Sequence, residues 1–170
     1  ILAGRDLEQM GTWLGVNRRG RITALTNFRD GRAKTEGKKS RGELTRQILE
    51  SSKPIPSQLK TLSSATEEYS GFNLLASDDT GIYYLNHLDQ TPTRLEKGVY
   101  GLSNAVLDSP WPKTNRLKEK LQHTLDNNPD RIDAASLTEL LLDREEAEDH
   151  LLPDTGISHE WEKHLSACFI

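Results

Sequence analysis

Two short runs of β-prone side chains flank a four-residue turn in TWLGVNRRGRITALT, residues 12–26. The runs are residues 12–16 and 21–26, and Asn17-Arg18-Arg19-Gly20 supplies turn residues between them. This spacing predicts a β-hairpin. A second hairpin is predicted for residues 72–76 and 82–86, which the polar segment Ser77-Asp78-Asp79-Thr80-Gly81 connects.

Helical periodicity appears between and after these hairpins. Leu44 and Ile48 repeat at helical spacing after Ser40-Arg41-Gly42-Glu43, which has the spacing of a capping box. Further elements are predicted as helices from Ser57, over 114–128 and after an Asp133 cap, and as strands at 93–95, 99–103 and 165–170. Strands and helices come in blocks rather than in strict alternation, which favours an α+β fold.

The composition describes one polar domain. The chain has 170 residues, 28% of them charged, with a mean hydropathy of -0.68 and no apolar run long enough to span a membrane. The single Cys168 excludes an internal disulfide and a cysteine-based zinc site, so a reducing, cytoplasmic compartment is expected. We predict a single domain over residues 1–170.

Charge is unevenly distributed along the chain. Residues 126–170 carry a net charge of -9, residues 1–125 carry +5, and residues 29–46 hold seven basic and three acidic side chains. The basic stretch lacks interleaved aromatic side chains, and the whole chain is acidic at -4, so a nucleic-acid partner is not expected.

Two carboxamides stand at the ends of predicted strands. Asn27 follows the second strand of the first hairpin, and Asn104 follows residues 99–103. A carboxamide there can donate hydrogen bonds to a developing oxyanion, or it can satisfy turn backbone; the residues alone leave both roles open. His159 and His164 are five residues apart, which on a helix puts them on different faces and excludes a zinc pair.

Several segments resemble signatures of the NRDE family, also called the transport and Golgi organisation type 2 family, over the whole chain and in the family's order. The matching segments are Ile1–Asp6, Gly11–Val16, Leu25–Arg29, Ser40–Gly42, Gly71–Leu75, Tyr100–Ala105, Asp108–Lys113, Leu152–Gly156 and Leu165–Ile170. The resemblance implies the αββα sandwich of N-terminal nucleophile hydrolases, in which antiparallel sheets lie between helix layers. It also implies a domain that is incomplete at the N-terminus and at the C-terminus.

The resemblance suggests which residues bind a ligand. By motif position, Asn27 and Asn104 are the oxyanion or ligand candidates, and the other candidate ligand-binding residues are Arg5, Asp6, Phe28, Arg29 and Trp111. The N-terminal cysteine nucleophile of such hydrolases has no counterpart here, and Cys168 does not replace it.

Three functions follow as expectations from the resemblance. The leading one is a ligand-handling protein in haem or acyl-lipid trafficking, with haem as a cargo and no cofactor required. The second is a cysteine amidohydrolase that acts on linear amide bonds, for which this chain lacks the nucleophile. The third is a scaffolding protein of the secretory pathway. We therefore expect a small-molecule or haem partner, no metal site and no nucleic acid.

Overall fold

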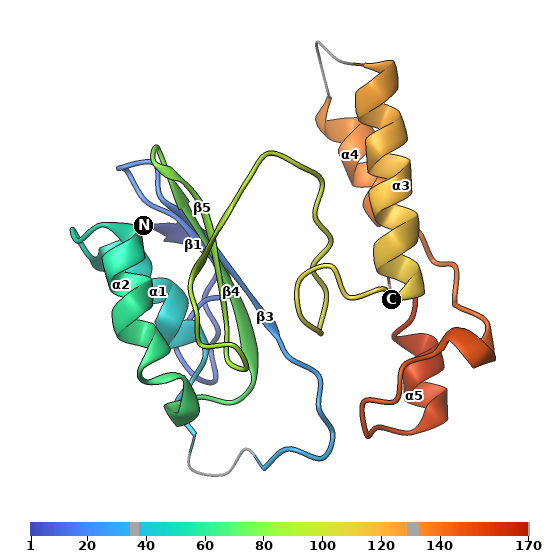
Figure 1. The fold of residues 1–170 in the computed structure, drawn as a ribbon, viewed down its shortest axis with the longest axis horizontal. Coiled ribbons are helices and arrows are strands. Elements are labelled where there is room, and N and C mark those ends of the chain that lie inside the picture. Colours follow the sequence, from blue (N-terminus) through green and yellow to red (C-terminus); the bar gives the residue numbers. More distant parts are fainter. Residues whose placement is uncertain (35–37, 129–132, 170) are drawn as a thin grey trace. The chain divides into compact units, whose positions relative to one another are not determined.

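The structure is a computed structural model that describes residues 1–34, 38–128 and 133–169. It forms two compact units (Figure 1). The sheet unit comprises residues 1–29, 33–97 and 104–106, and the helical unit comprises residues 30–32, 98–103 and 107–170. The single domain expected for residues 1–170 stays a prediction.

One antiparallel sheet contains all six strands of the described residues, and its spatial order follows the sequence. The strands are β1 (Leu2–Ala3), β2 (Leu14–Val16), β3 (Ile22–Asn27), β4 (Phe72–Asp78), β5 (Gly81–Asn86) and β6 (Thr93–Leu95). The pairs β2–β3 and β4–β5 confirm the two predicted hairpins. The α+β class is confirmed as well, whereas the N-terminal-nucleophile architecture stays a prediction.

The first hairpin turns as its residue types predict. Gly20 adopts a φ of 78°, which a glycine reaches without strain. The Asn17 side-chain oxygen accepts the backbone N–H groups of Arg19 and Arg21 at 2.8 and 3.1 Å. An asparagine that bonds its own turn fixes the register of the strands on either side.

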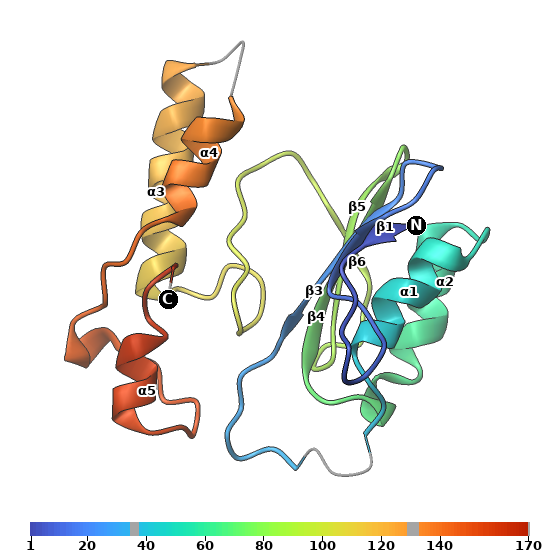
Figure 2. The ribbon, with the colours of Figure 1, turned by 180° about the vertical axis from the view of Figure 1, so that it is seen from behind.

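Helices α1 (Gly42–Glu50) and α2 (Ile55–Ser63) lie together against one face of the sheet, as Figures 1 and 2 show from opposite sides. Their apolar stripes meet the inward side chains of the central strands. The fully buried members of this core are Leu44, Ile48, Ile55, Leu59, Phe72, Leu74, Ala76 and Leu85. Burial of these side chains supplies the main driving force for the sheet unit.

Both helices in the sheet unit begin differently from the prediction. The predicted capping box is wrong, because Arg41 is the N-cap of α1 and makes no side-chain cap bond. The Glu43 N–H instead donates to the Ser40 carbonyl at 3.2 Å. Helix α2 begins at Ile55 rather than Ser57, because Pro56 lies in the first turn, where no N–H donor is needed.

A buried arginine closes the end of α1. The Arg21 guanidinium donates to the carbonyls of Ile48, Ser51 and Lys53 at 3.3, 2.7 and 2.5 Å. Helix C-termini leave carbonyls without intrahelical partners, and Arg21 satisfies them where water has little access, since the residue is 7% exposed. Arg21 therefore ties the first hairpin to α1.

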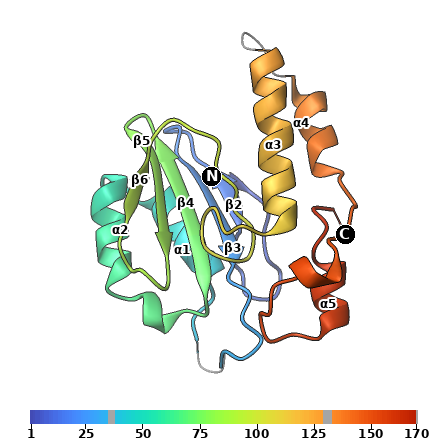
Figure 3. The ribbon, with the colours of Figure 1, turned by 45° about the vertical axis from the view of Figure 1, so that its right-hand side comes forward.

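The helical unit contains α3 (Pro112–Asn127), α4 (Ala134–Leu141) and α5 (His159–His164), and α3 lies beside α4 (Figure 3). Asp133 caps α4 by accepting the Ser136 N–H at 2.9 Å, as predicted. Few apolar side chains are buried in this unit. None of the helices in the described part of the chain is long and apolar enough to cross a membrane.

Two predicted strands are wrong. Residues 99–103 form no strand, because Gly101 exchanges backbone and side-chain hydrogen bonds with Asp108 at 2.8 and 2.9 Å and packs against Thr114 of α3. Residues 165–169 continue in turns from α5, where the Ser166 N–H donates to the Lys163 carbonyl at 3.0 Å. Ile170 lies outside the described residues.

A buried carboxylate organises the helical unit. The Asp143 carboxylate, 8% exposed, accepts from Lys120 Nζ at 2.7 Å and lies 3.3 Å from Arg116 Nε. Its backbone carbonyl accepts the Phe169 N–H at 2.9 Å. Hydrogen bonding by Lys120 and by the Glu145 N–H lowers the pKa of Asp143 to about 2.

We expect Arg21→Met to destabilise the chain by about 2–3 kcal/mol, because the carbonyls of Ile48 and Ser51 at the end of α1, and that of Lys53 just after it, lose the Arg21 donor. Urea unfolding followed by circular dichroism measures the change. Arg19→Met is the matched control, since the exposed Arg19 reaches one carbonyl, that of Glu50, at 3.3 Å. An equal loss of unfolding free energy in the two variants would contradict the role of Arg21 at the end of α1.

Asp143 also makes the free energy of unfolding depend on pH in the acidic range. Its folded pKa of about 2 lies below the value of 3.8 expected when unfolded, so its contribution is present above pH 4 and is lost as the pH falls toward 2. A difference of this size is worth about 2 kcal/mol. We expect Asp143→Asn to flatten the fall in urea stability between pH 4 and pH 2. An unchanged slope would show that other carboxylates carry the effect.

Candidate functional site

The end of β3 carries three of the candidate ligand residues. Asn27 is the last residue of the strand and pairs with Phe72 of β4. The Phe28 N–H then donates to the Gly71 carbonyl at 2.9 Å, and the Arg29 N–H donates to the Asn104 carbonyl at 2.7 Å. The chain therefore remains held to its neighbours after the strand has ended.

Asn104, which is distant in the sequence, contacts the backbone at the end of β3. Its Nδ2 donates to the backbone carbonyl of Asn27 at 2.9 Å, while its own carbonyl accepts the Arg29 N–H. The structure thus brings Asn27, Phe28, Arg29 and Asn104 together. The Asn104 side-chain amide already donates one hydrogen bond to the backbone. The role of Asn104 toward an oxyanion or a ligand stays a prediction.

Asn27 presents an acceptor without a partner. Its Oδ1 is buried and, within the described residues, makes no hydrogen bond. Most buried polar atoms in proteins are hydrogen-bonded, and an unsatisfied one calls for a bound group or a functional role. Asn27 Oδ1 is therefore the atom of this group best suited to accept an N–H or O–H from a ligand.

A polar network beneath Asn104 escaped the sequence reasoning. Asn73 is fully buried in β4, where its Nδ2 donates to the Ala105 carbonyl at 2.9 Å and to Thr26 Oγ1 at 3.2 Å. The Tyr84 hydroxyl donates to Asn73 Oδ1 at 2.6 Å. An asparagine inside the apolar run Phe72–Leu75 was the signal that could have revealed it.

His87 also lies at this end of the sheet. Its ring meets the ring of Phe28 edge-on, with centroids 4.7 Å apart, and its Nδ1 lies 3.4 Å from the Phe72 carbonyl. Gly71 allows the close fit, because a Cβ there would lie 3.1–3.2 Å from Phe28 and His87. A lone histidine in a sequence carries no spacing signal, so its place here was not predicted.

Arg41 connects this cluster to a basic pocket. The Arg41 guanidinium donates at 3.2 Å to the Gly71 carbonyl, which also accepts the Phe28 N–H, and burial lowers the pKa of Arg41. The pocket has a volume of about 320 Å³. Its lining includes Asp6, Trp13, Lys38, Lys39, Arg41 and Ser70, which we call the basic pocket.

The remaining predicted site residues lie elsewhere. Asp6 organises a turn by accepting the N–H groups of Glu8 and Gln9 at 2.9 and 3.3 Å, and it lines the basic pocket. Arg5 lines another pocket, which includes Ser40 before α1 and Arg46 within it. Trp111 belongs to the helical unit, where it is the N-cap of α3.

Among the described residues, no three histidine, cysteine, aspartate or glutamate side chains are grouped so that they could hold a metal ion. The polar groups gathered at the end of β3 and in the basic pocket include carboxamides, guanidinium and ammonium groups. Such groups bind anions and hydrogen-bonding ligands.

The sequence of this chain matches a known family. The model of a family described as Transport and Golgi organisation 2 matches residues 1–170. The Mus musculus Transport and Golgi organization 2 homolog is 35% identical over 176 residues, which cover 97% of this chain and 62% of the relative. The Homo sapiens homolog is 36% identical over 172 residues, covering 94% and 60%. The chain thus spans about three fifths of the length of these relatives.

Tyr84→Phe tests whether the buried network holds the Asn104 loop in place. The variant removes the donor to Asn73 Oδ1, and we expect a loss of about 1–2 kcal/mol together with faster hydrogen exchange at the Arg29 amide, which the Asn104 carbonyl protects. Tyr83→Phe is the control, because the Tyr83 hydroxyl contacts Thr80 in a hairpin turn at 3.0 Å. An Arg29 amide that exchanges equally in both variants would refute the link.

Proposed function

This chain belongs to the transport and Golgi organisation 2 family, and from that premise we propose that it is a ligand-handling protein whose cargo is an amphipathic anion, haem or an acyl lipid. The single free thiol, Cys168, suits the reducing, cytoplasmic setting that we infer for it.

The basic pocket is the observation that supports this proposal. Lys38, Lys39 and Arg41 bring three cationic groups to one pocket, whose lining also contains the acidic Asp6 and Glu8. Lys39 forms an ion pair with Glu68 and Lys38 donates to the Glu67 carbonyl, so an anionic ligand would compete with these partners. Trp13 adds an indole that is 49% exposed. Cations beside an open aromatic face suit a ligand with an apolar body and carboxylate or phosphate groups.

We expect the protein to bind the anionic groups of its cargo rather than to ligate an iron atom. His87 is the only histidine of the sequence that falls in the sheet unit, and its ring is packed against Phe28 and Gly71. An axial haem ligand needs an open face toward the iron. Haem propionates, in contrast, find ammonium and guanidinium partners in the basic pocket.

Amide hydrolysis receives less support from the described residues. Such a reaction needs an activated nucleophile, and burial raises the pKa of the Cys168 thiol, which favours the unreactive protonated form. The Cys168 thiol also donates to the Lys113 carbonyl at 3.7 Å. We expect no amide turnover from this chain.

Titration with haem and with iron-free protoporphyrin tests the proposal. Both carry the same two acidic side chains, so we expect saturable binding of both, followed by absorbance and by tryptophan fluorescence. Lys39→Gln and Arg41→Gln are each expected to weaken binding about tenfold, which corresponds to about 1.4 kcal/mol.

Arg94→Gln serves as the control, because Arg94 is an exposed arginine of β6 that donates to the Thr80 carbonyl at 3.1 Å, away from the lining of the basic pocket. Non-saturable binding, or equal affinity in Arg94→Gln and both pocket variants, would overturn the proposal. Binding of haem without binding of protoporphyrin would show that iron, not the acidic groups, is recognised.

A further inference from the structure

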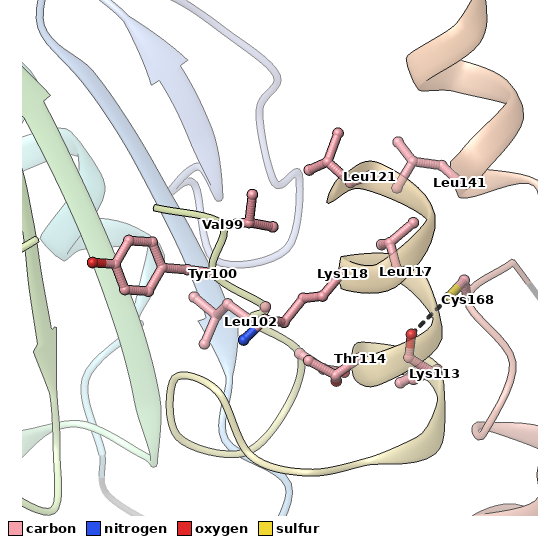
Figure 4. Close-up of a pocket in the computed structure, with 12 residues that line it drawn as sticks. Val99, Tyr100, Leu102, Lys113, Thr114, Leu117, Lys118, Leu121, Leu141 and Cys168 are labelled. Atoms are coloured by element: carbon pink, nitrogen blue, oxygen red, sulfur yellow. Dashed lines mark hydrogen bonds between the residues drawn. The ribbon is translucent and has the colours of Figure 1, made fainter. Parts of the chain in front are cut away.

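The helical unit contains a second pocket of different character. It has a volume of about 310 Å³ and lies along α3, between residues 99–103, Leu141 of α4 and Cys168 (Figure 4). All of its lining belongs to the helical unit. No site residue predicted from the sequence lies in this lining.

Five of the twelve residues that line the pocket are aliphatic. They are Val99, Leu102, Leu117, Leu121 and Leu141, of which Leu117 and Leu121 stand one helical turn apart on α3. Figure 4 shows Leu117, Leu121 and Leu141 close together on one side of the pocket. None of these five side chains is buried, and Leu141 is 56% exposed. An apolar ligand would remove their surface from water, which is favourable in proportion to the area covered.

The two lysines and the thiol that line the pocket are engaged by the protein. Lys118 Nζ binds Asp108 Oδ1 at 2.5 Å, and Lys113 Nζ donates to the carbonyls of Leu165 and Ala167 at 2.8 and 3.4 Å. The Cys168 thiol donates to the Lys113 carbonyl at 3.7 Å, drawn as the dashed line in Figure 4. The two lysines therefore present mainly their methylene stems, and the interior of the pocket is close to neutral.

Size and shape narrow the class of ligand. A cavity of about 150 Å³ holds one benzene, so this pocket of about 310 Å³ suits about ten to twelve carbon atoms. Along α3 the lining extends from Lys113 to Leu121, which is roughly 12 Å at the helical rise. We propose that this pocket binds an unbranched hydrocarbon chain of about ten carbons, uncharged within the pocket.

This pocket does not suit a porphyrin. No histidine or methionine lines it, and the one thiol is held in its protonated form. The hydrocarbon site shares no side chain with the basic pocket, because residues of the helical unit alone line it. The two lysines bind groups of the protein, so the ligand needs no anion.

Cys168 gives the chain a reporter inside the pocket, since it is the single cysteine of the sequence and is partly exposed. The experiment measures the rate at which N-ethylmaleimide labels Cys168 at pH 8.5 by mass spectrometry. We expect 1-decanol to slow labelling at least tenfold in a saturable manner. We expect 1-butanol, which is too short to fill the pocket, to have little effect at equal concentration.

Leu121→Gln places a polar group in the pocket wall and is expected to abolish the protection by 1-decanol. Leu125→Gln is the matched control, because Leu125 lies one turn further along α3 and outside the lining. Helix content measured by circular dichroism verifies that both variants fold. Should Leu121→Gln unfold, Leu141→Gln replaces it, because α4 has no buried residue to lose.

Labelling that 1-decanol leaves unchanged would overturn the proposal. Equal protection in Leu121→Gln and Leu125→Gln would overturn it too, since it would place the alcohol elsewhere. Haem binding has no part in this assay. A failure of haem to bind the basic pocket would therefore leave the hydrocarbon site standing, and the converse holds as well.

Discussion

The pairing of β3 with β4 is the contact on which the sheet unit depends. Its six residue pairs extend from Ile22 opposite Ser77 to Asn27 opposite Phe72, and the connection between the strands carries α1 and α2. The other neighbouring strands of the described sheet are joined without an intervening helix. Closing so long a connection costs conformational entropy. Packing of α1 and α2 over Leu25 and Leu74, which face each other across the pair, offsets that cost.

The same pairing sets the geometry of the candidate site. Across β3, β4 and β5 the row Thr26, Asn73 and Asn86 is polar, whereas the row two residues further along the strands consists of Ala24, Leu75 and Tyr84. Asn73 holds the Ala105 carbonyl from within this row, and Asn104 thereby reaches the end of β3. A buried carboxamide is tolerated where its hydrogen bonds are made, and it then defines one arrangement of the loop above it.

Different interactions stabilise the two units. The sheet unit is stabilised by a buried aliphatic core, and its polar groups gather where strands end. The helical unit buries few apolar side chains and is organised by polar contacts, above all those of Asp143 with Arg116 and Lys120. Leucines of α3 and α4 consequently remain partly exposed around a pocket. One unit therefore offers charge to a ligand and the other offers hydrocarbon surface.

Local patterns determined much of the fold in advance. Strand alternation and turn residues such as Gly20 predicted both hairpins, and the i, i+4 leucines predicted α3, because these signals act between near neighbours in the chain. The same reasoning failed at residues 99–103 and 165–169. Those runs are strand-like in composition, but bonds to Asp108 and to α5 satisfy their backbones instead of a strand partner.

The sequence by itself determined the α+β class, the hairpins and, through its family likeness, the candidates Asn27 and Asn104. Only the tertiary structure decided that Asn104 fastens the backbone at Asn27, that Asn73, His87 and Arg41 lie beside them, and that Cys168 lines an apolar pocket. The physical reason is the sequence separation of the residues that make each contact. Propensity and periodicity describe contacts within a few residues, whereas these contacts join segments between about 30 and 77 residues apart, and only folding brings such segments together.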